Sequence, residues 1–334
     1  MAKASNVKII ISVIIIGAAL AVILASGVGR EGSPTEESAA PGKAGKFGTG
    51  GQNESCFLNE IDKNSYPKAK APEKPPLLRW DFSGNKVYAY DYRQELKNKY
   101  DMGGPAPVKD AEQVIEGKGK LLLKSRGNRT ANLVLKDMQV EMKITKMGFE
   151  TKDKTPGSMK LKKFPPIVVQ GVKEDSAMKV ANSSQEMLIK LLFPLPPKPL
   201  KVGESADVPA FLPFNAMGSL LHVTGESTIT LTSYVTINGR TCARLETKTD
   251  ISKLDVPEEM KGTYGCLATS RSVFYFDIEE RAFVRGGLAF LMKMRVDAPM
   301  PEMEVPDMPA LQDAPKRMKM QMEMDTIISL ERAP

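Results

Sequence analysis

The side chains that could carry chemistry in this chain are few, because its 334 residues include three cysteines and one histidine. Catalysis through an imidazole would have to use His222, whose leucine and valine neighbours are typical of a strand. The chain has enough cysteines and histidines for one site of three cysteines and one histidine, but the cysteines lack the short C-x-x-C spacing of structural zinc sites. We therefore predict no catalytic residue, no metal site and no cofactor.

Two of the cysteines are spaced as a hairpin would require for a disulfide. Cys242 and Cys266 lie on either side of a turn expected near Leu254 and Asp255, which would bring them nearly opposite each other. In an oxidising compartment they would then form a disulfide, provided that their Cα atoms come within about 7 Å. The disulfide and two free thiols are both open interpretations, and Cys56 has no partner in either.

The chain is rich in methionine, with 19 residues against 12 phenylalanines. Methionines alternate with polar residues at 318–324 and again at 292–294. Thioether sulfur suits Cu(I), so copper binding is one interpretation of these runs. A period of two also places the methionines on one apolar face of a strand without any metal, and we favour that interpretation.

Basic residues are concentrated in segment 118–163, which holds thirteen basic and four acidic side chains, a net of +9 against +7 for the whole chain. A basic surface favours anionic partners such as lipid headgroups or acidic envelope polymers. Alternatively, these lysines are the solvated side of edge strands, where charge discourages aggregation. Nucleic acid is not expected, because few aromatic residues are present to stack on bases. The candidate patch consists of Lys118, Lys120, Lys124, Arg126, Arg129, Lys160, Lys162 and Lys163.

The N-terminus predicts a membrane segment. Residues Ile9 to Gly29 contain no charge and no proline, and they follow Lys3 and Lys8. As a helix this run is about 30 Å long, which matches the hydrocarbon core of a bilayer. The basic flank predicts an inner-membrane anchor with the rest of the chain in the periplasm or extracellular space. The small residues at 25–27 would also suit a signal peptidase, so secretion after cleavage is the alternative.

Residues 30–76 are rich in glycine, proline, serine, alanine and charged residues and show no sustained apolar period. Such a composition cannot bury enough apolar surface to offset the entropy of ordering. We predict a disordered tether between the membrane segment at 1–29 and a folded region that begins at 77.

From residue 77 onward, apolar side chains recur with a period of two, which predicts half-buried antiparallel strands. Tyr88, Tyr90 and Tyr92 share one strand face, and Asn238-Gly239 predicts a hairpin turn. One helix is predicted at 183–193, where the sequence SSQEMLIKLLF combines a capping box with apolar residues at helical spacing.

The strand region also shows a faint internal repeat. A shift of 112 residues aligns Arg126–Lys136 with Asn238–Lys248. Gene duplication is one explanation of this repeat, and the sequence pattern that hairpins have in common is the other. We predict a mainly β fold of antiparallel sheets in two similar halves, as a sandwich or open barrel, with one short amphipathic helix and the N-terminal transmembrane helix. The halves are 77–193, which ends in the helix, and 194–334.

Several motifs resemble a family of exported bacterial envelope proteins of unknown function: GNKVYAYDY, LPPKPLKVGES and NGRTCARLE. In that family an LPxKPVxVG[DE][ST] corner divides two β-rich halves. This chain departs from the family at 204–207, where Glu-Ser-Ala-Asp replaces the segment that usually carries a tryptophan. The resemblance implies envelope localisation and no established activity.

These features predict a non-enzymatic, membrane-tethered, extracytoplasmic β protein that binds an apolar ligand such as a lipid in a methionine- and leucine-lined interior. The alternative is a structural or interaction protein that docks anionic polymers or headgroups through segment 118–163. A hydrolase is a third hypothesis and requires a cleft with converging carboxylates. The sequence indicates a membrane partner but no oligomeric state.

Overall fold

The computed structural model describes residues 65–103, 108–149, 157–161, 164–178, 184–216, 219–256, 262–299 and 317–333. The membrane segment predicted at 1–29 lies outside these ranges, as does the predicted tether up to residue 64. Within these ranges, no helix has the length and apolar character that crossing a membrane requires.

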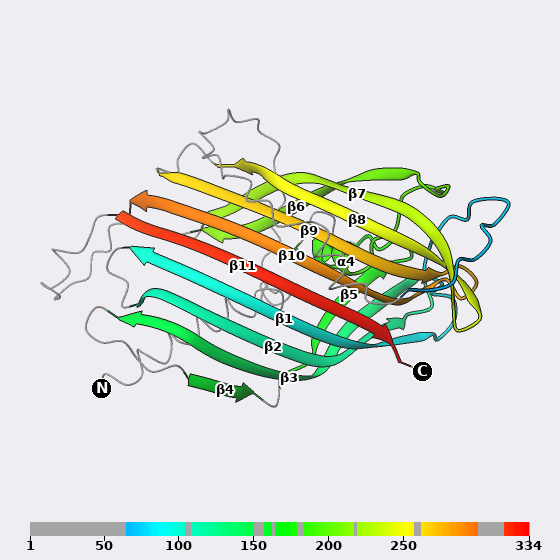
Figure 1. Ribbon diagram of the computed structural model, residues 1–334, viewed down its shortest axis with the longest axis horizontal. Helices are drawn as coiled ribbons and strands as arrows, with labels where there is room; N and C mark the ends of the chain where they lie inside the picture. Colours follow the sequence, from blue (N-terminus) through cyan, green and yellow to red (C-terminus); the bar gives the residue numbers. More distant parts are fainter. Residues whose placement is uncertain are drawn as a thin grey trace, which may run out of the picture.

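A single sheet of eleven strands makes up most of the described structure (Figure 1). The spatial order is β4-β3-β2-β1-β11-β10-β9-β8-β7-β6. Strand β5 pairs with the same edge of β3 as β4 does, but nearer the start of β3. All of these pairings are antiparallel. The elements are β1 (Val87–Gly103), β2 (Val108–Ser125), β3 (Thr130–Phe149), β4 (Gly157–Leu161), β5 (Ile167–Lys173), α4 (Ser184–Leu192), β6 (Ser205–Ala216), β7 (Ser219–Ile237), β8 (Arg240–Asp255), β9 (Thr263–Asp277), β10 (Ala282–Pro299) and β11 (Arg317–Arg332).

The structure confirms a mainly β, antiparallel fold with one short helix in its described part. In place of several antiparallel sheets it shows one continuous sheet, in which the strands of 77–193 and those of 194–334 stay grouped on either side of the β1–β11 pair. The C-terminal strand β11 returns to pair with β1, while β1 also pairs with β2. The predicted halves, 77–193 and 194–334, therefore contribute to one continuous sheet.

The hairpin predicted at Asn238-Gly239 is confirmed. It joins β7 to β8 with Ile237 opposite Arg240. Both turn residues have positive φ, 52° at Asn238 and 78° at Gly239. This is the backbone geometry that two-residue hairpins favour, because its twist matches that of the flanking strands.

The predicted helix is confirmed as α4, although Ser183, its proposed N-cap, lies outside the described residues. The sheet bends so that β6 and β7 pass behind β8–β10, and α4 lies on that side and contacts β6 and β10 (Figure 1). Leu188, Ile189 and Leu192 of the helix are buried against the sheet. We call the sheet face that packs on α4 the inner face and the opposite face the outer face.

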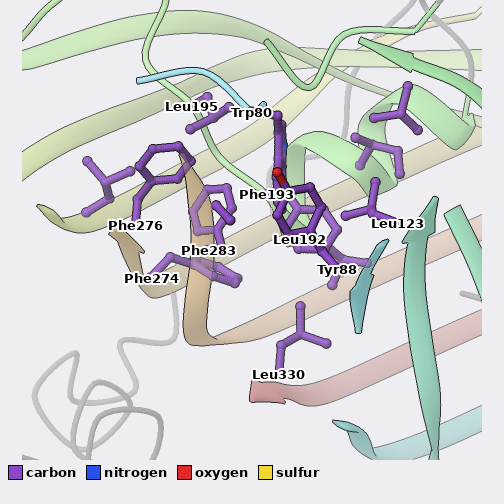
Figure 2. Packing of buried hydrophobic residues seen from close by; sticks show 14 of the residues in the cluster. Trp80, Tyr88, Leu123, Leu192, Phe193, Leu195, Phe274, Phe276, Phe283 and Leu330 are labelled. Atoms are coloured by element: carbon purple, nitrogen blue, oxygen red, sulfur yellow. The ribbon is translucent and has the colours of Figure 1, made fainter. Parts of the chain in front are cut away.

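An aromatic core fills the inner face beside α4 (Figure 2). Trp80, which precedes β1, is fully buried, and its indole donates a hydrogen bond to Ser176 Oγ at 3.2 Å. Its ring centroid lies 5.2 Å from those of Phe193 and Phe283 and 5.3 Å from that of Tyr88. The chain before β1 therefore belongs to the core and not to a linker.

Residues 65–69 extend this ordered region into the range predicted as a tether. Lys68 forms a β-bridge with Val235, and the Tyr66 ring lies 5.2 Å from that of Tyr275. The last part of segment 30–76 thus packs on the sheet, because it offers a tyrosine and backbone groups that extend the pairing of β7.

Hydrogen bonds join the proline-rich segment after α4 to the segment that leads into β1. The Arg79 guanidinium donates hydrogen bonds to the carbonyls of Pro196 at 2.7 Å and Pro197 at 3.0 Å. This contact crosses between the two predicted halves, which agrees with their forming one sheet.

Gly286 is expected to be irreplaceable on the inner face. It lies opposite Phe274, and a Cβ at this position would come within 1.9 Å of that ring. Gly286→Ala should therefore lower the free energy of unfolding by about 1–3 kcal/mol through overpacking. Gly117→Ala is the matched control, since its Cβ would make ordinary van der Waals contacts with Met138 at 3.4 Å, Gln94 at 3.8 Å and Val140 at 4.0 Å. Denaturant unfolding should show the control unchanged or stabilised by up to about 1 kcal/mol, and equal losses in both variants would contradict the packing.

Candidate functional site

The inner face carries two apolar clusters of different composition. The first inner cluster is the aromatic core around Trp80 and α4, and one methionine occurs among its 33 buried residues. The second inner cluster lies farther along the same strands and has five methionines among 16. Its methionines are Met142, Met187, Met292, Met322 and Met324.

Polar side chains lie along the boundary of the two clusters, with Asn98 one row inside the second, and form what we call the polar belt. It consists of Asn98 (β1), Thr326 (β11), Ser270 and Ser272 (β9) and Thr247 (β8). Each is at most 6% exposed. Among the residues that the structure describes, the hydroxyls of these residues and both amide atoms of Asn98 have no hydrogen-bond partner. Because most buried polar groups in proteins are paired, five such residues on one face need an explanation, and a bound water or ligand would supply the missing partners.

Other polar groups on the same face are paired. The hydroxyls of Ser227 and Thr249 lie 2.8 Å apart, in the same cross-strand row as Ser270. Gln113 donates a hydrogen bond to the Tyr100 hydroxyl at 3.1 Å, and burial raises the pKa of Tyr100 to about 12. Tyr100 is therefore neutral at physiological pH. The groups of the polar belt thus differ from these neighbouring polar side chains, which have hydrogen-bond partners.

The inward-facing positions of β8, β9 and β10 carry no aspartate, glutamate, lysine or arginine, whereas Arg332 lies on this face at the end of β11, opposite Tyr90, and pairs with Glu280. In β9, for example, Cys266, Ala268, Ser270, Ser272 and Phe274 succeed one another on the inner face. A site on this face would hold an uncharged group, because a buried ion without a counter-ion is strongly destabilised.

The predicted basic patch is divided between the outer face and one turn. Lys118, Lys120 and Lys124 project from the outer face of β2, whereas Arg126 and Arg129 belong to the β2–β3 turn. Lys162 and Lys163 lie outside the described residues.

Several patch residues are neutralised by acidic partners. Lys120 pairs with Asp91 of β1, Arg129 donates to Glu174 at 2.9 Å, and Lys160 lies 3.4 Å from Glu141. Asp91 and Glu174 come from outside segment 118–163, so the net charge of that segment overstates the charge of the surface.

The structure corrects the disulfide hypothesis, because Cys242 and Cys266 are both free and buried. In the β8–β9 hairpin Cys242 is opposite Asp277, and Ile251 is opposite Ala268. The hairpin is therefore centred between positions 259 and 260, not near Leu254. The two thiols also lie in different apolar clusters, Cys266 on the inner face and Cys242 on the outer.

Both thiols are expected to stay protonated and to react slowly in the folded protein. Burial raises the pKa of Cys242 and of Cys266 to about 12, above the ordinary value of about 8.5. Since unfolding releases these protons, their contribution to stability is complete below pH 8.5 and is lost as the pH rises toward 12. Iodoacetamide followed by peptide mass mapping should label both after unfolding and neither before it. A peptide pair linked by these two residues would contradict the structure.

His222 projects from the outer face of β7 and is exposed. In the part of the chain that the structure describes, no three histidine, cysteine or acidic side chains are grouped as a metal site would require. Of the methionines in the second inner cluster, Met322 and Met324 occupy successive inward-facing positions of β11, as the apolar-lining interpretation expects.

Sequence reasoning missed the polar belt, although a signal was available. Ser270 and Ser272 occupy the same alternate positions as Ala268 and Phe274, which are apolar and buried. Small hydroxyl residues at inward-facing positions of an otherwise apolar strand are the pattern that could have indicated it.

In the described ranges, the fold and this site define a mainly β protein whose antiparallel sheet packs an apolar inner face on the helix α4. No protein-family model and no curated protein matches the chain.

Comparison with solved structures finds limited similarity. One match is a DUF1329 family protein from Desulfovibrio piger, at 10% identity, with 70% of this chain and 83% of that chain covered and a TM-score of 0.13. Another is the enduracididine biosynthesis enzyme MppR, at 10% identity, with 75% and 88% covered and a TM-score of 0.13. A third, an acetoacetate decarboxylase-like enzyme from Sphingomonas wittichii, has 10% identity, 75% and 94% coverage and a TM-score of 0.11. Similarity at these TM-scores does not bear on function.

Proposed function

We propose that this protein binds an uncharged amphiphile, a lipid-like molecule with an ester, amide or hydroxyl group, on the inner face of its sheet. The polar belt is the observation that carries this proposal. Each buried polar group without a partner costs about 1–3 kcal/mol, which a hydrogen bond to a ligand would offset. Thr247 and Ser272 face each other across β8 and β9, so one carbonyl oxygen can accept from both hydroxyls.

The apolar chain of the ligand would lie along the second inner cluster. Methionine side chains are unbranched and flexible, so a methionine-rich wall can repack around a guest more readily than the aromatic core can. Met187 belongs to that cluster and Leu191 packs against it, and both residues lie on α4. Opening the second inner cluster would therefore require Met187 and Leu191 to move, while Leu188, Ile189 and Leu192 of the same helix stay packed in the aromatic core.

The setting of this binding is proposed from the sequence. Residues 9–29 would anchor the chain in the inner membrane, and the sheet would lie in the periplasm or extracellular space. An anchored protein of this kind would bind an amphiphile close to the membrane without catalysing a reaction on it. Secretion after cleavage would change its location but not the proposed site.

Native mass spectrometry of protein extracted gently from membranes tests the proposal. We expect a co-purifying, uncharged lipid-like molecule at about one per chain, released when the protein unfolds. Binding of a monoacylglycerol to delipidated protein should then be saturable. A chain that carries no adduct and binds no monoacylglycerol would contradict the proposal.

A further inference from the structure

A hollow of about 1110 Å³ lies on the outer face, opposite the proposed lipid site. It extends over β11, β1, β2, β3 and β4, which lie side by side at the front of Figure 1. The lining includes three cationic and three anionic side chains, so it carries no net charge. These residues are Arg93, Lys118, Lys160, Glu95, Glu116 and Glu141.

The strand register places the charges of β1, β2 and β3 in rows of like sign, and Lys160 of β4 lies at the end of the acidic row, opposite Glu141. Arg93 is directly opposite Lys118. In the neighbouring outward-facing row, Glu95 is opposite Glu116, which in turn is opposite Glu141. Directly opposed like charges destabilise antiparallel strands, so this order does not serve the stability of the sheet. Local arrangements that act against stability are expected at functional sites.

The two rows differ in how their charges are compensated. Each acid has a lysine within ion-pairing distance, but these lysine side chains are 46–65% exposed, so the pairs are weak and can be exchanged. Arg93 and Lys118 have no ion pair or hydrogen bond with any residue in the described part of the chain. The pairs are Lys97–Glu95 at 3.1 Å, Lys143–Glu116 at 3.0 Å and Lys160–Glu141 at 3.4 Å.

We propose that this hollow binds a small zwitterion that carries a phosphate and an ammonium group, the chemistry of phosphoethanolamine. The Arg93 guanidinium and the Lys118 ammonium hold the phosphate oxygens, for which the planar fork of arginine is well suited. The carboxylates of Glu95 and Glu116 lie in the next row, about 7 Å along the strands, where they accept hydrogen bonds from the ligand ammonium. An anion without an ammonium group, such as inorganic phosphate, would contact Arg93 and Lys118 but would be repelled by the carboxylates of Glu95 and Glu116.

Isothermal titration calorimetry on the full-length protein tests this site with two probes, phosphoethanolamine and inorganic phosphate. We expect phosphoethanolamine to bind at least tenfold more tightly than phosphate. The R93Q/K118Q variant should lose at least tenfold in affinity for both probes. The E95Q/E116Q variant should lose affinity for phosphoethanolamine and gain affinity for phosphate. Lys124→Gln is the matched control, because Lys124 is an exposed lysine on the same face of β2 outside the hollow.

Vesicles distinguish a lipid headgroup from a free metabolite as the source of this chemistry. Residues 9–29 would bind any bilayer, so the informative quantity is the difference between the wild type and R93Q/K118Q. A difference on vesicles that contain phosphatidylethanolamine, absent on phosphatidylcholine alone, assigns the site to the headgroup. Phosphoethanolamine binding without that difference assigns it to a free zwitterion. No binding of phosphoethanolamine by the wild type, or equal binding by R93Q/K118Q and K124Q, would overturn the proposal.

Discussion

Replacing Trp80 with alanine is expected to lower the free energy of unfolding by about 3–5 kcal/mol. The side chain is fully buried and contacts aromatic rings from β1, from β10 and from Phe193, the residue after α4. Its removal leaves a large cavity and deprives Ser176 of its donor. Natural domains have a total stability of about 5–15 kcal/mol, so this one substitution removes a large share.

Denaturant unfolding followed by far-ultraviolet circular dichroism measures the effect, since the alanine variant has no other tryptophan to report by fluorescence. Leu77→Ala is the control, because Leu77 is 49% exposed and only three residues away. It should change the free energy of unfolding by less than about 0.5 kcal/mol. Similar losses in both variants would show that the segment before β1 is not part of the core.

Removing hydroxyls from the polar belt is expected to stabilise the protein and to weaken ligand binding. In the variant T247V/S272A, each lost hydroxyl removes a buried, unpartnered group, which should raise the free energy of unfolding by about 1–3 kcal/mol per group. If these hydroxyls bind the polar group of an amphiphile, the affinity for a monoacylglycerol should fall about tenfold or more. Thermal unfolding and a binding titration on the same preparations measure both effects.

Thr249→Val is the matched control for this pair. Thr249 lies in the same strand and on the same face as Thr247, but its hydroxyl is paired with that of Ser227. Its loss should lower stability by about 0.5–1.5 kcal/mol and leave monoacylglycerol affinity nearly unchanged. A stabilised T247V/S272A variant with full affinity would mean that the belt is not the binding site.

Much of the fold could be predicted from the sequence because it depends on local patterns. The alternation at Tyr88, Tyr90 and Tyr92 placed these side chains on one buried face, and Asn238-Gly239 specified its hairpin. Strand partners are a different matter, since a period of two indicates which face is buried but not which strand lies beside it. The pairing of β1 with β11, which joins the halves into one sheet, joins segments more than 200 residues apart, and no local pattern indicates it.

The error at the cysteines has a similar origin. Equal spacing about Leu254 suggested a turn there, but β8 continues to Asp255. A hairpin centred five residues later places Cys242 opposite Asp277 instead of Cys266. Because successive side chains point to opposite faces of a sheet, a shift of register changes which residues can meet.

Neither candidate site could be predicted from the segments that contain it. The rows of like charge in the outer hollow arise from the register of β1, β2 and β3, which includes a bulge between Lys118 and Lys120. The polar belt draws one or two residues from each of four strands. The alternation within β9 marks Ser270 and Ser272 as inward-facing, but only the folded sheet shows that polar residues of four strands come together.

Photo-crosslinking is the most direct test of the central claim that an amphiphile binds on the inner face. A monoacylglycerol with a diazirine in its acyl chain would be bound to the full-length protein, irradiated and mapped by peptide mass spectrometry. We predict adducts on β10 and β11 near Met292 and Met324, which unlabelled monoacylglycerol competes away and T247V/S272A strongly reduces. Adducts confined to outer-face residues, or unaffected by competitor, would contradict the account.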